Sequence, residues 1–198
     1  MHPGRHPSPH TSGAPSDWLQ RWAHLLPAGG RLLDLACGRG RHLRWAVARG
    51  FAVTGIDRDA AALAESLDLA HAGSAELITA DIENAPWPLP GRQFDAVLVF
   101  NYLWRPLWPD LIGALAPGAV LVCETFAAGN ASVGKPSRPD FLLQAGELIQ
   151  RCAGLTVVAY EHGFLENPAR FVQRVVAVRA VADSAAPPRH ALQATLAP

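Results

Sequence analysis

The strongest constraint on the fold is an alternation of short apolar runs and helix-forming segments through the first two thirds of the chain. Each apolar run has the length of a buried strand, and Gly, Pro or a segment with helical spacing follows it. The predicted strands are 31–37, 51–57, 75–81, 94–101 and 119–126. Strands joined by helical crossovers pair in parallel within one sheet that has helices on both faces.

The remaining segments extend this pattern. Helices are expected at 16–26, 39–50, 58–73, 104–118 and 142–154. Residues 155–166 and 169–181 read as two strands joined by a short turn at Asn167 and Pro168, which predicts a C-terminal antiparallel hairpin. The expected fold class is therefore α/β, with a Rossmann-like, seven-stranded, mostly parallel sheet.

The domain organisation follows from length and local composition. A chain of 198 residues with 49% hydrophobic residues is long enough for one domain with a sizeable core. We expect the folded domain at 16–182. Residues 1–15 are rich in Pro, His, Ser and Gly and predict a disordered tail, and 183–198 predict a second flexible tail.

Charge and cysteine content narrow the class of protein. The formal net charge is +0, whereas a nucleic-acid-binding protein usually carries a basic excess, so no nucleic-acid partner is expected. Three separate cysteines without a CxxC pair fit a reducing compartment. The absence of a signal-like start and of a long apolar run favours a cytoplasmic protein without a membrane partner. No His/Cys cluster or paired acids predict a metal.

The stretch LDLACGRG, 33–40, is the first candidate for ligand binding. Gly38 and Gly40 permit a tight turn after the first strand and close approach of a ligand to the backbone. Asp57 ends the second strand, where a carboxylate can accept both ribose hydroxyls, and Asp81 ends the third, near an adenine edge. Asp34 would repel a diphosphate, but it attracts the cationic sulfonium and amino groups of S-adenosylmethionine.

Together these motifs resemble the class I S-adenosylmethionine-dependent methyltransferases over roughly residues 16–180, with LDLACGRG, GIDRD, ADIENAPWP and FDAVLVFNYL as the matching segments. Loop residues further resemble small bacterial methyltransferases of the tellurite-resistance type. The resemblance implies S-adenosyl-L-methionine as the cofactor and a set of contacting residues that surround its methionine, ribose, adenine and sulfonium parts. In chain order these are Asp34, Cys37, Gly38, Gly40, Asp57, Arg58, Asp81, Ile82, Phe100 and Asn101.

Three alternatives compete with this interpretation. The segment GNASVGK, 129–135, begins like a phosphate-binding loop, but Pro136 replaces the required Ser or Thr and disfavours a helix start. A nicotinamide-dependent oxidoreductase is disfavoured because Leu43 occupies the third glycine position of GxGxxG. A non-catalytic module that only binds S-adenosylmethionine stays open, and turnover with an acceptor would separate it from an enzyme.

The methyl acceptor is predicted to be a small molecule of the thiol, oxyanion or carboxylate type. No NPPY-type run follows the fourth strand, which disfavours amino groups of nucleic-acid bases or of glutamine as acceptors. Tyr102, Arg105 and Glu124 follow or end the fourth and fifth strands and are the candidate catalytic residues. Simpler roles compete: Tyr102 as a core ring, Arg105 as a solvated helix residue and Glu124 as a partner of Arg138. The sequence predicts no oligomeric state.

Overall fold

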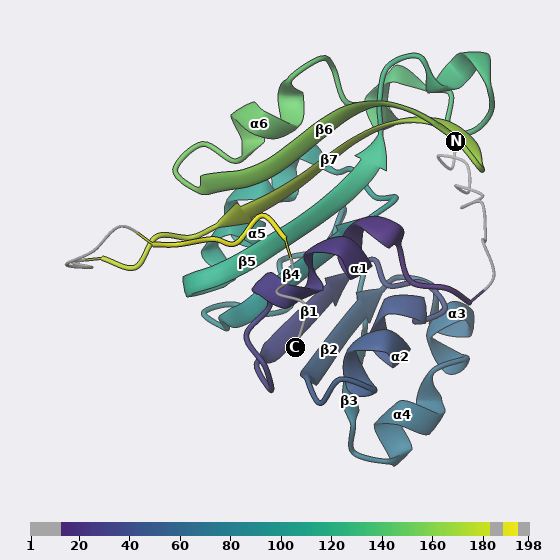
Figure 1. Ribbon diagram of the computed structural model, residues 1–198. Helices are drawn as coiled ribbons and strands as arrows, with labels where there is room; N and C mark the ends of the chain where they lie inside the picture. The colour runs from purple at the N-terminus through teal and green to yellow at the C-terminus, as the bar shows by residue number, and fades with distance from the viewer. Residues whose placement is uncertain (1–12, 183–187, 194–198) are drawn as a thin grey trace.

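The computed structural model describes residues 13–182 and 188–193, and its centre is one seven-stranded sheet (Figure 1). The strand order is β3-β2-β1-β4-β5-β7-β6. The strands are β1 Arg31–Leu35, β2 Ala52–Asp57, β3 Ala75–Thr79, β4 Phe94–Phe100, β5 Leu115–Phe126, β6 Thr156–Glu166 and β7 Ala169–Val178. Strands β1 to β5 pair in parallel, and β7 runs antiparallel to both β5 and β6. The predicted sheet is confirmed, including its C-terminal hairpin.

The helices are short and cover both faces of the sheet. The α-helices are α1 Asp17–Trp22, α2 Arg41–Val47, α3 Ala60–Ala64, α4 Leu67–His71, α5 Trp108–Gly113 and α6 Glu147–Arg151, and the 3-10 helices are η1 Ala23–Leu25, η2 Arg105–Leu107, η3 Asn130–Ser132 and η4 Pro139–Phe141. Side chains of α1, α2 and α3 pack in one core cluster, and side chains of α5 and α6 pack in the other. The sheet therefore separates two hydrophobic layers.

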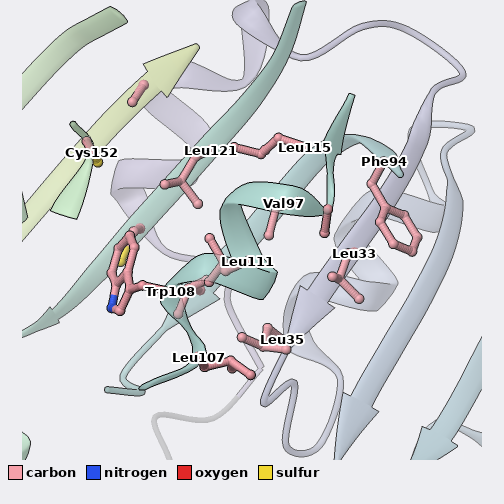
Figure 2. Close-up of a cluster of buried hydrophobic side chains, with 14 of the residues drawn as sticks. Leu33, Leu35, Phe94, Val97, Leu107, Trp108, Leu111, Leu115, Leu121 and Cys152 are labelled. Atoms are coloured by element: carbon pink, nitrogen blue, oxygen red, sulfur yellow. The ribbon is translucent and has the colours of Figure 1, made fainter. Parts of the chain in front are cut away.

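The α5 side of the sheet shows how these layers are filled (Figure 2). Alternate residues of the strands, such as Leu33 and Leu35 of β1, meet Trp108 and Leu111 of α5. Each of these four side chains is buried. Because successive side chains of a strand point to opposite faces, Leu32 of the same strand joins the α1 side instead. Burial on both faces explains why the central strands read as continuous apolar runs.

One predicted helix is broken. The segment 58–73 forms α3 and α4 instead of one helix, with the break at Glu65 and Ser66. Ser66 is fully buried and its Oγ donates a hydrogen bond to the Arg39 carbonyl at 3.1 Å. The prediction was wrong here because a tertiary contact to the loop after β1 decides the conformation of Ser66.

The segment 129–135 does not form a phosphate-binding loop. Asn130 is buried at the start of η3, and its side chain donates to the Pro136 carbonyl and accepts from the Phe171 backbone N–H. The first helix after Lys135 is the short η4. The segment 129–135 is thus hydrogen-bonded to β7 and is not arranged to bind a phosphate.

The predicted tails fall largely outside the described residues. Residues 1–12, 183–187 and 194–198 are not described, so the expected disorder there stays a prediction. The described piece 188–193 does contact the domain, because the Ala191 carbonyl lies 2.9 Å from His24 Nε2. Among residues 13–182 and 188–193, none of the helices has the length and apolar character needed to cross a membrane.

Candidate functional site

The loop after β1 forms a tight turn that leaves space in front of Gly38. The backbone adopts positive φ at Ala36, Gly38 and Gly40, with values of 52°, 57° and 78°. A Cβ on Gly38 would meet no heavy atom within 4 Å, whereas a Cβ on Gly40 would lie 2.1 Å from Ser66 Oγ. Gly38 therefore faces open space that a ligand can use. Gly40 is required by the contact with Ser66.

Cys37 contributes to this turn through its backbone. Its N–H donates to the Ile56 carbonyl at 3.0 Å, while its side chain is buried, and burial raises the pKa of the thiol. The strand residue Gly55 makes this packing possible, since a Cβ there would lie 2.9 Å from Leu43 Cδ1 and 3.1 Å from Cys37 Sγ. Sequence analysis did not single out Gly55, although a glycine inside a strand signals close approach of another group.

Asp57 lies against the same turn. Its Oδ2 accepts from the Gly38 N–H at 2.7 Å and its Oδ1 accepts from the Asp59 N–H at 2.9 Å. The cap of α3 is Asp59, whose carboxylate accepts from the backbone N–H groups of residues 61 and 62. Asp57 is thus not the helix cap. It joins the end of β2 to the glycine turn, and each oxygen keeps a further lone pair for a ligand.

Asp81 forms a turn in the loop after β3. Its carboxylate accepts from the backbone N–H groups of Glu83 and Asn84 and from the Asn84 side chain. The hydrogen bond from the Asn84 side chain is the main reason why the pKa of Asp81 is lowered. Arg58 reaches this loop through an ion pair of 3.7 Å with Glu83, and Ile82 is buried in the α5-side core.

Asp34 is the most unusual group at this edge of the sheet. Its side chain is fully buried, and neither carboxylate oxygen has a hydrogen-bond partner among the described residues. Burial is the main cause that raises its pKa to about 8, with a smaller contribution from Asp57, while Arg41 opposes both. Leaving a buried carboxyl without partners is costly, so this group points to a ligand that supplies them.

The end of β4 lies next to this carboxyl in the sheet. Phe100 is buried, with its ring centroid 4.2 Å from that of His42. Asn101 has a positive φ of 56°, and its N–H donates to the Glu124 carbonyl at 2.9 Å. The register pairs Asp34 with Leu98, so Phe100 extends just beyond Asp34 toward the carboxyl ends of the strands. These positions suit the predicted floor of the cofactor site.

The three candidate catalytic residues have different surroundings. Tyr102 has a buried hydroxyl that makes no well-formed hydrogen bond with the described residues, although the Glu83 carboxylate lies near it. Burial raises its pKa, and the neighbouring charge of Glu83 acts in the same direction. Because Arg58 and Asp81 are its other charged neighbours, Tyr102 lies on the side predicted to hold adenine.

Arg105 is committed to the segment 140–147. Its guanidinium forms an ion pair of 2.8 Å with Glu147 and donates to the carbonyls of Asp140 and Leu142. Burial alone would raise the pKa of Glu147, but hydrogen bonds from Arg105 and its other partners outweigh it and hold the pKa at about 2. These contacts hold Arg105, a candidate catalytic residue, against the segment 140–147, so it is not the solvated helix residue of the simpler alternative. Arg105 also lines a hollow together with residues such as Gln144 and Gln150. The residues at the ends of β1 to β3 do not line this hollow, so it is separate from the candidate cofactor site.

Glu124 is the buried end of a row of charged side chains that crosses three strands. It is 1% exposed and pairs with Arg170 at 2.9 Å and with Arg174 at 3.4 Å. Arg174 lies directly between Glu124 of β5 and Glu161 of β6 in the strand register and also binds Glu161. The partner suggested by the sequence was wrong, because Arg138 pairs with Asp140.

Arg170 and Arg174 were not among the site residues predicted from the sequence. One signal was available, since Glu124 lies near the end of a largely apolar strand and a buried carboxylate needs a cationic partner. Four positions apart on one strand, the two arginines share a face. The Arg170 Nε is buried and has no hydrogen-bond partner among the described residues. In the described part of the chain, no group of three or more His, Cys, Asp or Glu residues could hold a metal ion.

Comparisons with known proteins agree with this geometry. Residues 32–118 match the family model described as a methyltransferase domain. The tRNA U34 carboxymethyltransferase of Alcanivorax borkumensis is 33% identical over 122 residues, which are 56% of this chain and 37% of that protein. The ribosomal protein L11 methyltransferase of Bordetella parapertussis is 37% identical over 123 residues, which are 60% of this chain and 36% of that protein. The chain thus covers little more than a third of these curated relatives.

Solved structures resemble this protein over most of its fold. TehB from Haemophilus influenzae superimposes with a TM-score of 0.69 at 18% identity, covering 85% of this chain and 63% of that one. The protein has the fold of TehB and of other S-adenosylmethionine-dependent methyltransferases, and residues 32–118 resemble a methyltransferase domain.

The resemblance to methyltransferases points to S-adenosylmethionine as the cofactor, and the chemistry of the residues at the strand ends fits that group. The open space in front of Gly38 admits a ligand against the backbone. The unpartnered carboxyl of Asp34 provides acceptors for a cationic group. Asp57 follows Gly38 by 19 residues, which is the spacing at which an acidic residue binds ribose hydroxyls in related folds. Two acids at the turn also make a diphosphate a poor ligand.

Proposed function

We propose that this protein transfers a methyl group from S-adenosylmethionine to a small anionic acceptor. The main support for S-adenosylmethionine as the cofactor is the Asp34 carboxyl. It is buried and unpartnered among the described residues near the end of β1, four residues before the open turn at Gly38. When bound, S-adenosylmethionine supplies a methyl group activated by its positive sulfur. The protein contributes alignment of the two reactants and exclusion of water.

The cofactor contacts follow the strand ends. Asp34 would neutralise the cationic methionine end, and Asp57 would accept hydrogen bonds from the ribose while keeping the glycine turn in place. Arg58, Asp81 and Ile82 would surround the adenine. Tyr102 belongs to this group because its charged neighbours are those of the adenine loop.

The acceptor is assigned to the β5–β7 side. Arg105 is already bound to Glu147 and two carbonyls, so it offers little to an anion. Arg170 pairs with Glu124 through one guanidinium nitrogen, while its buried Nε stays without a partner among the described residues. A buried donor without an acceptor favours an anionic ligand at this place. The oxyanion and carboxylate classes fit this donor best.

Transfer of radiolabelled methyl groups from S-adenosylmethionine to panels of acceptors tests the proposal. Label is expected in small oxyanions, carboxylates or thiolates. Arg170→Gln should raise the KM for such an acceptor by about tenfold, the value of a charge-assisted hydrogen bond, with cofactor affinity within about threefold. The matched control is Arg31→Gln, because Arg31 is an exposed arginine at the N-terminal end of β1, away from the carboxyl ends of the strands.

Two other outcomes would replace this assignment. The two curated relatives described above are named for a tRNA and a ribosomal protein, so transfer of label to bulk tRNA or to protein would contradict the small acceptor. Binding of S-adenosylmethionine without transfer to any of the three panels would favour a non-catalytic binding module.

A further inference from the structure

The ring of His42 lies between the candidate cofactor site and the start of α1. His42 is 3% exposed, and its Nδ1 lies 4.0 Å from Asp34 Oδ1. Its Nε2 lies 3.2 Å from the backbone nitrogen of Ser16. The ring also packs on Phe100. His42 is therefore held on three sides by groups from β1, β4 and the segment that enters α1.

The contact with Ser16 determines which ring nitrogen carries the proton. A backbone N–H can only donate, so Nε2 must be the acceptor and the proton of a neutral ring resides on Nδ1. Burial, with help from the charge of Arg41, lowers the pKa of His42 to about 3, so the ring is neutral at physiological pH. His42 consequently has its one N–H on the nitrogen nearest to Asp34.

The start of α1 is well anchored, which keeps the Ser16 donor in place. Ser16 Oγ caps the helix by accepting from the Trp18 N–H at 3.1 Å. Trp18 Nε1 donates to the Val175 carbonyl of β7, and Arg21 pairs with Glu161 of β6 at 2.8 Å. The position of the Ser16 N–H thus depends on the packing of α1 against the C-terminal hairpin.

We propose that His42 is a positioning residue for the cofactor: its Nδ1–H, oriented by the Ser16 N–H, supports the charged form of the Asp34 carboxylate that receives the cationic methionine end. This inference rests on the proposed function. The other charged groups that act on Asp34 are Arg41, which favours the carboxylate, and Asp57, which disfavours it. Asp57 ends β2, whereas Arg41 begins α2 and its Nη1 donates to the Ala14 carbonyl at 3.4 Å, so Arg41 also contacts the segment that enters α1.

Two substitutions of His42 separate its two nitrogens. In His42→Asn the side-chain amide can place a donor near the position of Nδ1, whereas in His42→Gln it reaches toward the position of Nε2 and leaves Asp34 without a donor. We expect His42→Gln to bind S-adenosylmethionine at least about threefold more weakly than His42→Asn, because the Nδ1–H acts on the carboxylate across 4.0 Å and not through a full hydrogen bond. Titration calorimetry measures both.

The same pair is compared without cofactor. Carbon-13 NMR of the Asp34 carboxyl should show a higher pKa in His42→Gln than in the parent, and a pKa close to that of the parent in His42→Asn. A residue that only fills space would shift both variants alike, because each removes the ring. Equal pKa values and equal affinities in the two variants would overturn the proposal.

A second pair tests the Ser16 donor and does not alter His42. Ser16 has φ −58° and ψ 138°, which proline adopts without strain, so Ser16→Pro removes the N–H and the Oγ cap together. Ser16→Ala removes only the cap and is the matched control. We expect Ser16→Pro to bind S-adenosylmethionine at least about threefold more weakly than Ser16→Ala. Identical affinities would refute the role of Ser16.

These measurements keep two failures apart. If the parent protein does not bind S-adenosylmethionine, the cofactor assignment fails, while the pKa comparison on the cofactor-free protein still decides the role of His42. If the His42 variants do not fold, the Ser16 pair decides it. Circular dichroism of each variant identifies that case.

Discussion

Replacing Asp34 by Asn should change how the stability of the cofactor-free protein depends on pH. The substitution keeps the shape of the side chain and removes its charge. Burial is the main cause that raises the pKa of Asp34 from 3.8 to about 8 in the folded protein. Between these two values the folded chain holds a proton that the unfolded chain has released. Its stability therefore falls as the pH rises through this window.

His42 contributes the opposite slope in acid. Its pKa falls from 6.5 to about 3 on folding, so its contribution to stability is lost as the pH falls through that range. The two slopes cancel between about pH 4 and 6.5. From pH 6.5 to 8 Asp34 acts alone. At about 1.36 kcal/mol per pKa unit, the parent should lose about 2 kcal/mol of unfolding free energy over this interval.

Urea denaturation of the cofactor-free parent and of Asp34→Asn at several values between pH 6.5 and 8 measures this loss. The parent curve should fall by about 2 kcal/mol, and the Asp34→Asn curve should be nearly flat. Asp110→Asn, at an exposed position on α5, is the control and should follow the parent. Parallel slopes in the parent and Asp34→Asn would show that Asp34 titrates normally and would refute the reasoning from its burial.

Three further predictions concern packing and the candidate catalytic residues. Gly40→Ala should lower the unfolding free energy by about 1–3 kcal/mol, because residue 40 has a positive φ and a Cβ there would clash with Ser66 Oγ. Adding Ser66→Gly to the same chain should restore part of this loss, and urea denaturation measures both changes. Arg105→Ala should cost about 1–3 kcal/mol by leaving Glu147 without its ion pair, while turnover of a small acceptor stays within about threefold; a larger loss of turnover would restore Arg105 to the acceptor site. Tyr102→Phe should change the melting temperature only slightly, because the buried hydroxyl makes no well-formed hydrogen bond although the Glu83 carboxylate lies near it. A marked drop would show that Tyr102 and Glu83 share a hydrogen bond.

The strands were predictable because local sequence determines them. Runs such as 94–101 are apolar on both faces, and Gly or Pro bounds most of them, so burial and length left few alternatives. The parallel order then followed from the crossover rule. The break at Ser66 was not predictable, because it depends on a contact with a loop 27 residues earlier in the chain.

The candidate site divides in the same way. Sequence position alone placed Asp57 at the end of β2 and Asp81 close to the end of β3, which stops two residues earlier, at Thr79, so that Asp81 lies in the following loop. The partners of Glu124 could not be placed in this way, because Arg170 is 46 residues away and the pair exists only through the register of β5 with β7. The contact between Ser16 and His42 equally needs the packed position of α1. Site residues that lie at strand ends can be predicted from the sequence, whereas residues that pair between different helices and strands can be identified only from the structure.

The anchoring of α1 has a consequence for biosynthesis. Trp18 donates its indole hydrogen bond to a residue of β7 that lies 157 positions later in the chain. Helix α1 thus leaves the ribosome long before the strand that fixes it, since β7 is made much later in translation. Until then Trp18, Leu19 and Trp22 can pack only on the earlier part of their core cluster, such as Leu32 and Leu43, and the side that β7 covers in the finished protein stays open to chaperones.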